Sequence, residues 1–475
     1  MATTDVEDKA SPAPAATPVA PTVYSKKYTA WMLFLLAVTY ANDYADRSVL
    51  RILAQPIKAE MNLSDTQLGL LSGLAFSVFY ALFGYPLARL SEKTGRINII
   101  TACAVVWSCF TAACGTATNF AQLLFYRFGV GAGESGMAAP SHSLISDYFP
   151  PNRRTTAIAL FSMGVPVGAL AGVIAGGWLA EHYGWRAAFL IISIPGFLLA
   201  PLVKLTIKEP IRGNWDASRL AGKPAEKTPP LKEVLKKQFA TQTFRAICIG
   251  HVLCVFSASG SAFTAAYLVR RFEIPYTTVG FALGLLSAVG IITAFMSGFL
   301  TDQLAKWNKR WYCLLPAIAV TVQAVLHFAG YMQSTWQMQL FFMFLAAFCA
   351  ITSVPFYGMT QNLLPARMRA SGAAVIFFLI NLIGLGFGPV FFGMVIDQFT
   401  NVTFAGYGIG EYVTTCGKGG LLATAEHLPM CKAALAHATR WTLACESFGL
   451  LGGAMLFLYA SRFAARDLSE AERTN

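Results

Sequence analysis

Long apolar stretches recur along this chain and constrain its fold more than any other feature. They form two groups of six, separated by a polar, basic segment at about 208–240. A helix of about 20 apolar residues crosses a bilayer, whereas a barrel strand needs only about half that length. Hydrophobic residues make up 55% of the chain and charged residues 13%, whereas soluble domains carry about 25% charged residues. We therefore expect an all-α integral membrane protein with 12 transmembrane helices in two pseudo-symmetric six-helix bundles.

The apolar stretches also set the expected domain boundaries. The expected helices cover about 28–55, 64–90, 96–117, 119–148, 153–181 and 186–207, then 241–271, 276–305, 309–331, 335–364, 368–399 and 437–463. The expected parts are a disordered tail at 1–27, a bundle at 28–207, a linker at 208–240, a bundle at 241–463 with an extracytoplasmic insert at about 400–436, and a tail at 464–475. The first residues are acidic and then rich in Ala and Pro, which is unlike a signal peptide and typical of disorder.

Lysine and arginine alternate from one side of the expected spans to the other. The linker and every second loop are basic, whereas the loops between them hold few basic residues. This bias predicts a multi-pass protein of the cell (inner) membrane with both termini and the linker in the cytoplasm. The same placement explains the net charge of +12 without a nucleic-acid partner.

The two halves of the sequence repeat each other. Pro150 and Arg154 correspond to Pro365 and Arg369 after a shift of 215 residues. Similar motifs at similar shifts indicate a duplicated six-helix unit. Parallel repeats of this kind place a substrate site at the interface between the repeats, near the middle of the membrane.

A charged loop between the second and third spans carries a family resemblance. The segment "ARLSEKTGR" is similar to the inner-loop motif of the major facilitator superfamily, although Ala88 stands where glycine is usual. Gly298 and Asp302 form a weaker second copy, and "GWRAAF" opens the sixth span. The resemblance covers nearly the whole chain and implies a secondary transporter that works by alternating access.

Within that superfamily the first half resembles the Spinster group. The stretches that carry this resemblance are "YANDYADRSVL", "RFGVGAGESGMAAPSHSLISDYFP" and "GVPVGALAGVIAGGWLA". It implies a small amphipathic substrate, such as a lysolipid or sphingolipid, or an organic anion. A multidrug or small-solute efflux carrier is the alternative. A membrane enzyme or receptor is a rival class, but no nucleophile–base pair or metal cluster is visible in the sequence.

Charged residues inside the expected spans are the strongest candidates for function, because such residues are costly in lipid and usually face a cavity or a partner. Asp46 in the first span and Arg127 in the fourth both fall in the outer half of the membrane, where they are able to pair. Glu134 lies two turns deeper than Arg127. We expect Asp46 and Glu134 to be proton-coupling carboxylates with Arg127 as their partner, and protons to be the coupling ion. Arg47, Arg127 and Glu134 are expected to line the substrate cavity.

Neighbouring charges in the first span were weighed as well. Asp43, Arg47 and Arg51 are expected to be more exposed, and Asp43 to be a polar helix face. Aromatic residues of the second half are expected to give the cavity an apolar wall: Phe256, Phe263, Tyr267, Phe356 and Tyr357.

The inner-loop charges are expected to act as gate latches between the halves. A carboxylate near a helix N-terminus gains about 0.3–1 kcal/mol, and the opposite half presents such an end to Glu92 and to Asp302. The expected gating residues are Glu92, Lys93, Arg96, Arg154, Asp302 and Arg369. The alternative is that they only set the topology.

Glycines in the fourth and fifth spans indicate close helix packing. Gly131-x-Gly133-x-x-Gly136 matches a dinucleotide fingerprint in spacing, but it lies in a helical span with no strand before it, so we interpret it as a packing face. A stripe at every fourth residue is either a packing face or the closure of one end of the transport path: Gly164, Gly168, Gly172 and Gly176.

Cysteine and histidine residues predict no metal site and no cofactor. Cys416 and Cys431 are the two cysteines in the expected outer insert, and we expect them to form a disulfide. His142, His251 and His327 have no companions at metal-ligand spacing and are interpreted as core or cavity side chains. We expect a monomer whose other partners are membrane lipids.

Overall fold

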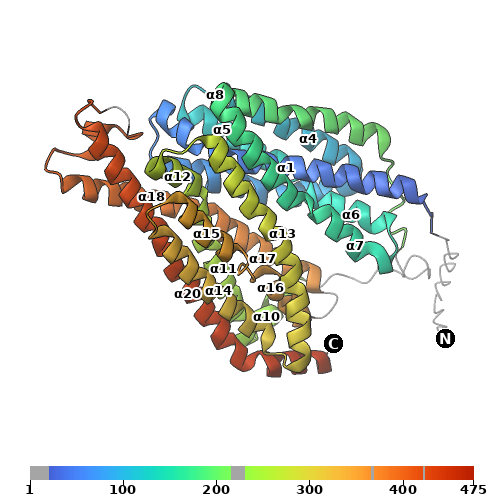
Figure 1. Ribbon diagram of the computed structural model, residues 1–475. Coiled ribbons are helices and arrows are strands. Elements are labelled where there is room, and N and C mark those ends of the chain that lie inside the picture. Colours follow the sequence, from blue (N-terminus) through green and yellow to red (C-terminus); the bar gives the residue numbers. More distant parts are fainter. Residues whose placement is uncertain (1–20, 216–229, 365–367, 421–422, 475) are drawn as a thin grey trace, which may run out of the picture.

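The computed structural model describes residues 21–215, 230–364, 368–420 and 423–474. Within these ranges the chain is helical and contains no strand. The helices group into twelve spans, six in each half, as the sequence predicts (Figure 1). Eight helical stretches are long and apolar enough to cross a membrane. The first helix is not among them, because charged and polar residues interrupt its second half.

The first half contains spans 1 to 6. Its elements are α1 (Lys26–Met61), α2 (Asp65–Gly69), the π-helix η1 (Leu70–Leu74), α3 (Ala75–Thr94), α4 (Arg96–Cys114), α5 (Phe120–Glu134), α6 (Ala138–Tyr148), α7 (Pro151–Ser162) and α8 (Gly164–Thr206). The long helix α8 carries two spans, because Gly184 with φ of 78° breaks its helical backbone. Gly95, with φ of 97°, separates α3 from α4.

The second half contains spans 7 to 12. Its elements are α11 (Gln242–Ala258), the 3₁₀ turn η2 (Ser259–Phe263), α12 (Thr264–Phe272), α13 (Tyr276–Trp307), α14 (Trp311–Tyr331), α15 (Trp336–Ala347), α16 (Ser353–Asn362), α17 (Arg369–Leu379), the π-helix η4 (Ile380–Phe387), α18 (Gly388–Ala405), α19 (Tyr412–Cys416) and α20 (Leu428–Thr474). In the described part of the linker between the halves there is a short helix, α10 (Leu231–Gln238).

Several boundaries differ from those expected from hydropathy. The outer insert is shorter than 400–436, because α18 continues to Ala405 and α20 begins at Leu428. Residues 464–474 form the last turns of α20 rather than a separate tail. These helix ends are polar or amphipathic, so a search for apolar runs stops before them.

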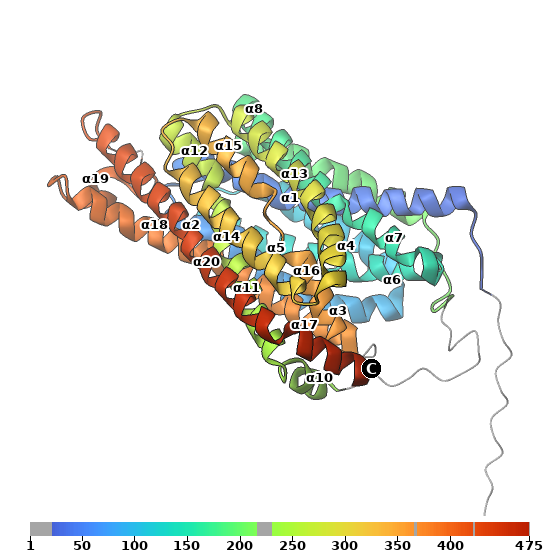
Figure 2. The ribbon, with the colours of Figure 1, turned by 60° about the horizontal axis from the view of Figure 1, so that its bottom comes forward.

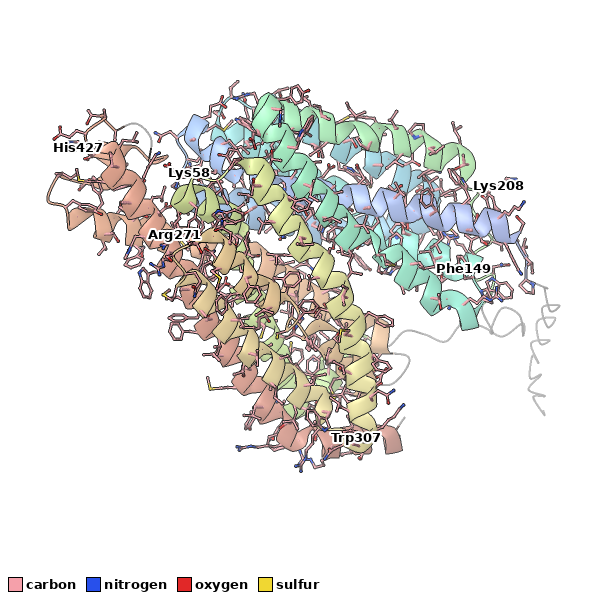
Figure 3. All side chains as sticks on the ribbon, in the orientation of Figure 1. Lys58, Phe149, Lys208, Arg271, Trp307 and His427 are labelled. Atoms are coloured by element: carbon pink, nitrogen blue, oxygen red, sulfur yellow. A yellow bond between two sulfur atoms is a disulfide. The ribbon has the colours of Figure 1, made fainter. Side chains whose placement is uncertain are left out.

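The two halves converge at one end of the molecule and diverge toward the ends that carry the termini (Figures 1 and 2). Lys58 and Arg271 lie at the converging end, and Phe149 and Trp307 lie at the diverging ends (Figure 3). The buried apolar clusters follow this division. One cluster contains residues of both halves, such as Leu53 and Tyr267, whereas two others each stay within one half. We call the converging end the closed end and the other the open end.

Candidate functional site

A cavity of about 490 Å³ lies between the halves. The first half contributes three arginines to its wall: Arg47, Arg51 and Arg127. The second half contributes small polar and aliphatic side chains, including Ser259, Gln323, Asn381, Val255, Ala258, Leu385 and Leu450. We call it the central cavity. One wall is therefore cationic and the other uncharged.

The expected aromatic wall is wrong. None of the five aromatic residues named from the sequence lines the central cavity in the described chain. Phe263, Tyr267 and Phe356 are fully buried in the core instead. Large rings in membrane helices fill space between helices, so their presence in a span does not locate a cavity.

Arg47 on α1 joins two carboxylates beside the central cavity. Its Nε lies 2.5 Å from Glu134 Oε2 on α5, and its Nη2 lies 3.0 Å from Asp43 Oδ1 one turn earlier on α1. The guanidinium also lies 4.5–4.7 Å from the ring centres of Tyr44, Phe76 and Tyr80. Asp43 is only 1% exposed and Glu134 is fully buried. The expectation that Asp43 is an exposed polar face is therefore wrong.

Asp46 and Arg127 occupy the same region without pairing directly. The Thr111 hydroxyl donates to Asp46 Oδ2 over 3.3 Å, and Arg127 Nε donates to the Leu71 carbonyl over 3.4 Å. No ion pair joins Asp46 to Arg127 in the described part of the chain, which corrects the expected pair. Arg47 rather than Arg127 is the direct partner of Glu134, because Arg47 and Glu134 face each other where α1 and α5 approach. Asp43, Asp46, Arg47, Arg127 and Glu134 together are called the central charge cluster.

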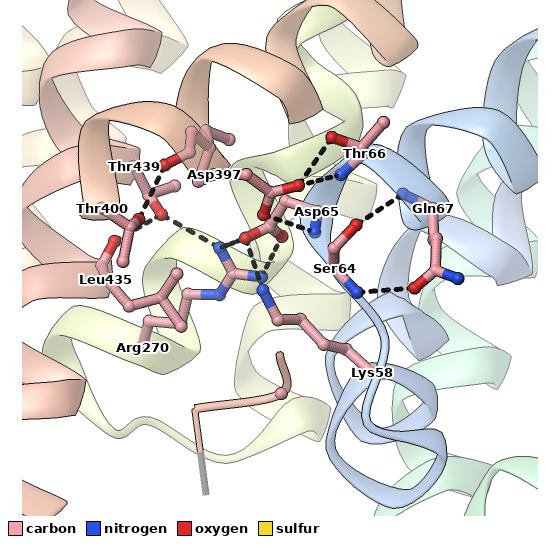
Figure 4. A network of polar contacts seen from close by, with 12 residues as sticks. Lys58, Ser64, Asp65, Thr66, Gln67, Arg270, Asp397, Thr400, Leu435 and Thr439 are labelled. Carbon is pink, nitrogen blue, oxygen red and sulfur yellow. Dashed lines mark hydrogen bonds and ion pairs between the residues drawn. The ribbon is translucent and has the colours of Figure 1, made fainter. Parts of the chain in front are cut away.

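A second polar network closes the other end of the path and was not expected from the sequence (Figure 4). Asp65 at the start of α2 lies 2.5 Å from Lys58 Nζ and 2.5 Å from Nη2 of Arg270, which belongs to the second half. Arg270 also donates to Gln55 over 2.8 Å and to Thr439 over 2.9 Å. Lys58 and Asp65 are fully buried. This closed-end network therefore ties the two halves together.

Asp397 on α18 completes that network from the second half. Its carboxylate oxygens accept the backbone N–H groups of Asp65 and Thr66, each over 2.8 Å, and the Thr66 hydroxyl over 2.6 Å. A carboxylate at this position caps the N-terminus of α2 and is favoured by the helix dipole. Individual charges near span ends gave no sign of this arrangement, because Arg270 and Asp397, the partners of Asp65 in the second half, lie more than 200 residues away from it.

The expected gate latches lie at the open end and make no contact across the halves in the described chain. Glu92 is exposed and pairs with Arg89 on its own helix over 3.3 Å, and Lys93 and Asp302 are exposed. Arg154 donates to the Ser146 carbonyl over 2.9 Å. The side chain of Arg369 lies outside the described part. Latching stays a prediction for a conformation in which this end is closed.

Arg96 has a different surrounding from the other predicted latches. It is 1% exposed, its Nε lies 2.7 Å from Glu209 Oε1, and its Nη1 pairs with Asp147. Nη1 also donates to the Ser143 hydroxyl over 2.9 Å. These contacts hold α4, α6 and the start of the linker together within the first half.

The glycines of α5 and α8 are helix-packing residues. A Cβ on Gly131 would lie 2.6 Å from the Phe76 carbonyl oxygen, and one on Gly133 would lie 2.8 Å from the Trp107 nitrogen. The α8 stripe faces α1 of the same half. Cβ atoms on Gly164, Gly168 and Gly172 would come within 2.0–2.7 Å of α1 carbonyl oxygens, and one on Gly176 would lie 2.6 Å from Val49.

The contact between the halves uses other glycines of the same region. A Cβ on Gly177 would lie 2.5 Å from the Tyr276 carbonyl oxygen, and one on Gly280 would lie 2.7 Å from that of Val173. The glycines of the four-residue stripe therefore pack α8 against α1 within the first bundle. Another face of α8, which includes Val173 and Gly177, packs against α13 of the second half.

The remaining candidates are cysteines and histidines. Cys416 and Cys431 form a disulfide with Cα atoms 5.8 Å apart, the pairing expected from the sequence. The described ranges contain no group of three or more His, Cys, Asp or Glu side chains placed to hold a metal ion. His251 stacks on Phe356 with ring centres 4.2 Å apart. His327, by contrast, has a carboxylate partner that the sequence survey missed, Glu446 on α20 at 2.7 Å.

Comparisons with known proteins agree with this architecture. Residues 36–389 match the sequence model of the Major Facilitator Superfamily. A solved bacterial homologue of the human lysosomal transporter Spinster, inward-facing and unoccupied, superposes with a TM-score of 0.85. It is 30% identical, over 94% of this chain and 99% of that one.

Two curated relatives match over most of their length. An MFS-type efflux pump of Mycolicibacterium smegmatis is 30% identical, over 77% of this chain and 84% of the relative. The hexuronate transporter of Bacillus subtilis is 27% identical, over 81% and 91%. With a family match over most of the chain and two bundles around a central cavity, this protein belongs to the major facilitator superfamily and is a secondary transporter rather than an enzyme.

Proposed function

We propose that this protein couples proton movement to the transport of an amphipathic anion, either lipid-like or a smaller organic acid. The observation that carries the proposal is the central charge cluster beside the central cavity, in which Arg47 pairs with Asp43 and Glu134 while Asp46 and Arg127 are buried in the same region. When all five groups are ionised the cluster carries a formal charge of −1. A net charge buried in a membrane protein is costly, and one proton removes it.

The contacts support a specific consequence of protonation. Arg47 is held by Asp43 and Glu134 at the same time. Protonating either carboxylate removes half of the charge that holds the guanidinium. Arg47 is 17% exposed and lines the central cavity, so its released charge becomes available to an anionic headgroup. We propose that Asp46 and Glu134 take the coupling proton, with Asp43 as a third acceptor.

The wall of the cavity supports the substrate class. Arginine binds carboxylate and phosphate groups through a planar fork of donors, and Arg51 and Arg127 stand beside Arg47. The opposite wall of Val255, Ala258 and other uncharged residues suits an apolar body. A probable sphingolipid transporter of Arabidopsis thaliana, a Spinster homologue that is 25% identical over 55% of this chain and 58% of the relative, supports a lipid-like substrate. The hexuronate transporter supports a soluble organic acid.

The open end is assigned to the cytoplasm in this proposal. The basic residues of the loops gather on the side of the termini, and the positive-inside rule places that side in the cytoplasm of the inner membrane. The structure then corresponds to an inward-open state, like its inward-facing structural relative. The closed-end network lies toward the outside.

Proteoliposomes test the proposal directly. Uptake of a labelled lysolipid and of labelled hexuronate is measured with and without an imposed proton gradient. We expect one of the two to accumulate only with the gradient. Glu134→Gln and Asp46→Asn are expected to lower gradient-driven uptake by about tenfold or more, equivalent to about 1.4 kcal/mol, and to retain substrate exchange. An unchanged dependence on pH in both variants contradicts proton coupling at this cluster.

A small-solute efflux carrier is the second candidate, and the relative from Mycolicibacterium smegmatis favours it. In that case, cationic dyes rather than anions would leave vesicles in exchange for protons. Competition between dye and lysolipid in the same vesicles separates the two candidates.

A further inference from the structure

A second buried acid lies in the second half, far from the central charge cluster. Glu446 on α20 is 3% exposed, and its Oε1 lies 2.7 Å from Nδ1 of His327 on α14. The other carboxylate oxygen, Oε2, has no hydrogen-bond partner. A Cβ on Gly260 would lie 2.8 Å from that oxygen. The carboxylate therefore fits at this position because residue 260 has no side chain.

The pair faces a cavity of its own. A cavity of about 300 Å³ is lined by His327, Glu446 and Tyr331 together with apolar residues of α13 and α15. It shares Arg51, Ala258, Ser261 and Gln323 with the wall of the central cavity. We call it the side cavity. Because they share these lining residues, the side cavity and the central cavity lie next to each other.

His327 and Glu446 differ in their access to the side cavity, and this difference gives them different roles in binding a proton. Both side chains line the side cavity, but the His327 side chain is 18% exposed and that of Glu446 is 2% exposed, so the imidazole is the more accessible member of the pair. When Nδ1–H donates to Glu446, Nε2 is the acceptor left for a proton from the cavity. Binding that proton converts a pair with a formal charge of −1 into a neutral ion pair.

Few other charges compete with the pair. From the neighbouring elements, α1 contributes Arg51, α12 contributes Tyr267 and α14 contributes Tyr331, which interacts electrostatically with Glu446. Arg440, two turns before Glu446 on α20, donates to the Tyr331 carbonyl over 2.8 Å. The residues of α13 and α15 that line the side cavity are not ionisable.

We propose that His327 and Glu446 form a second proton-binding site, located in the second half, which exchanges its proton with the central cavity. The site would let both bundles respond to protonation, each through its own buried carboxylate. The inference rests on the proposed proton coupling only for its role in transport. Proton binding by the pair itself can be measured in a protein that transports nothing.

The first experiment follows the ring nitrogens of histidine by NMR in the purified, 15N-histidine-labelled protein. The chain has six histidines, and the signal of His327 is assigned by its loss in His327→Gln. Between about pH 8 and pH 5 we expect this ring to change from the neutral to the doubly protonated form. In Glu446→Gln the midpoint of the change is expected to move. A His327 ring that keeps one form over the whole range in the wild type overturns the proposal, and so does a midpoint that Glu446→Gln leaves unchanged.

The second experiment measures transport, with His251→Gln as a matched control. His251 is also a buried histidine of the second half, but it stacks on Phe356 and has no carboxylate partner among the described residues. We expect His327→Gln to lower gradient-driven uptake by about tenfold and to retain exchange, whereas His251→Gln behaves like the wild type. Normal gradient-driven uptake by a folded His327→Gln variant contradicts a role in coupling. If the wild type shows no dependence on the gradient, the proposed function fails while the NMR result still stands or falls alone.

Discussion

Arg47 shows how much of the central cavity depends on the shape of one side chain. Its Nε contacts Glu134 and its Nη2 contacts Asp43, while the guanidinium plane lies among three aromatic rings. A lysine ammonium is a point charge without a planar fork, so it is unable to serve both carboxylates in this geometry. Charge alone does not account for the site.

Arg47→Lys is therefore expected to reduce substrate uptake by about tenfold, equivalent to about 1.4 kcal/mol, although the formal charge is kept. Uptake into proteoliposomes measures the loss. Arg89→Lys is the matched control, because Arg89 is exposed and pairs only with neighbours on its own helix. Equal uptake by Arg47→Lys and the control would show that a positive charge suffices.

The sequence indicated which residues matter at this scale but not how they pair. Intramembrane charges pointed to Asp46, Arg47, Arg127 and Glu134, and all four lie in one cluster. Their pairing depends on the rotation of α1 against α5, which a single sequence does not encode in any local pattern. Glu446 was missed for another reason, since it lies in a long, partly polar final helix in which an acid does not stand out.

At the scale of elements, the packing of α8 on α1 depends on the absence of side chains. A Cβ on Gly168 would lie 2.0 Å from the Ala41 carbonyl oxygen, which is backbone and has no room to yield. The four-residue spacing allowed this packing to be predicted, because small residues at that period share one helix face. Which helix the face meets was not predictable, and it proved to be α1 of the same half.

Gly168→Ala is expected to destabilise the protein by about 1–3 kcal/mol, the range for overpacking a close contact. A thermal unfolding curve in detergent measures the effect. Gly290→Ala on α13 serves as the control, because nothing lies within 4 Å of a Cβ at that position. If both variants unfold at the same temperature, the close approach of α8 and α1 is not what limits stability.

The disulfide lies in the long connection between α18 and α20, near the closed end. It joins α19 to the first turn of α20 across a separation of 15 residues. The chain-entropy model assigns about 3 kcal/mol to a loop of this size. Its location was predictable because these two cysteines are the ones that lie outside the apolar spans.

Replacing both cysteines, Cys416→Ala with Cys431→Ala, is expected to make the 406–427 segment more sensitive to protease while the two bundles stay folded. Limited proteolysis followed by mass spectrometry locates the new cleavage sites. Cys445→Ala is the control, because Cys445 is a free, exposed cysteine of α20. Cleavage spread evenly over the whole chain would argue that the bridge supports the entire second half.

At the scale of the whole molecule, the two ends differ in how the halves are joined. At the closed end, Asp65 forms ion pairs with Lys58 of its own half and with Arg270 of the other half. Asp397 of the second half caps α2, the helix that begins at Asp65. The side chains of Lys58, Asp65 and Arg270 are buried at the closed end, where removing one member of an ion pair costs about 3–5 kcal/mol. The twelve-helix arrangement was predictable from hydropathy and the internal repeat, but the conformational state was not, because sequence alone does not distinguish two states of similar energy.

Asp65→Asn is expected to shift the population toward states in which the closed end is open. Distances between spin labels on the loops after α1 and α12 measure that population. Glu273→Gln is the control, since the Glu273–Lys432 pair is exposed and such pairs contribute little. A distance distribution like that of the wild type would mean that apolar contacts alone hold this end shut.

For the predicted latches at the open end, we expect substitutions to favour the present conformation instead of the one in which the closed end is open. Glu92→Gln and Asp302→Asn are expected to increase the fraction of molecules in the present, open-end conformation, because each carboxylate would otherwise favour closure by about 0.3–1 kcal/mol. Spin labels on the loops after α3 and α13 report the fraction. Lys306→Gln is the control, because Lys306 contacts only Gln303 within its own helix. No change in either acidic variant would leave these charges with the role of setting topology.

The two π-helical segments meet across the halves just inside the closed-end network. A Cβ on Gly73 of η1 would lie 2.5 Å from the Gly386 carbonyl oxygen of η4, and one on Gly69 would lie 2.2 Å from that of Pro389. Backbone thus touches backbone there, without charged groups. Two successive layers therefore close the path at this end. The first consists of ion pairs, and the second consists of backbone in contact with backbone. When the ionic layer alone is disrupted, we expect this backbone contact to keep water from forming a continuous column, so that the membrane keeps its electrical resistance while the carrier begins to open.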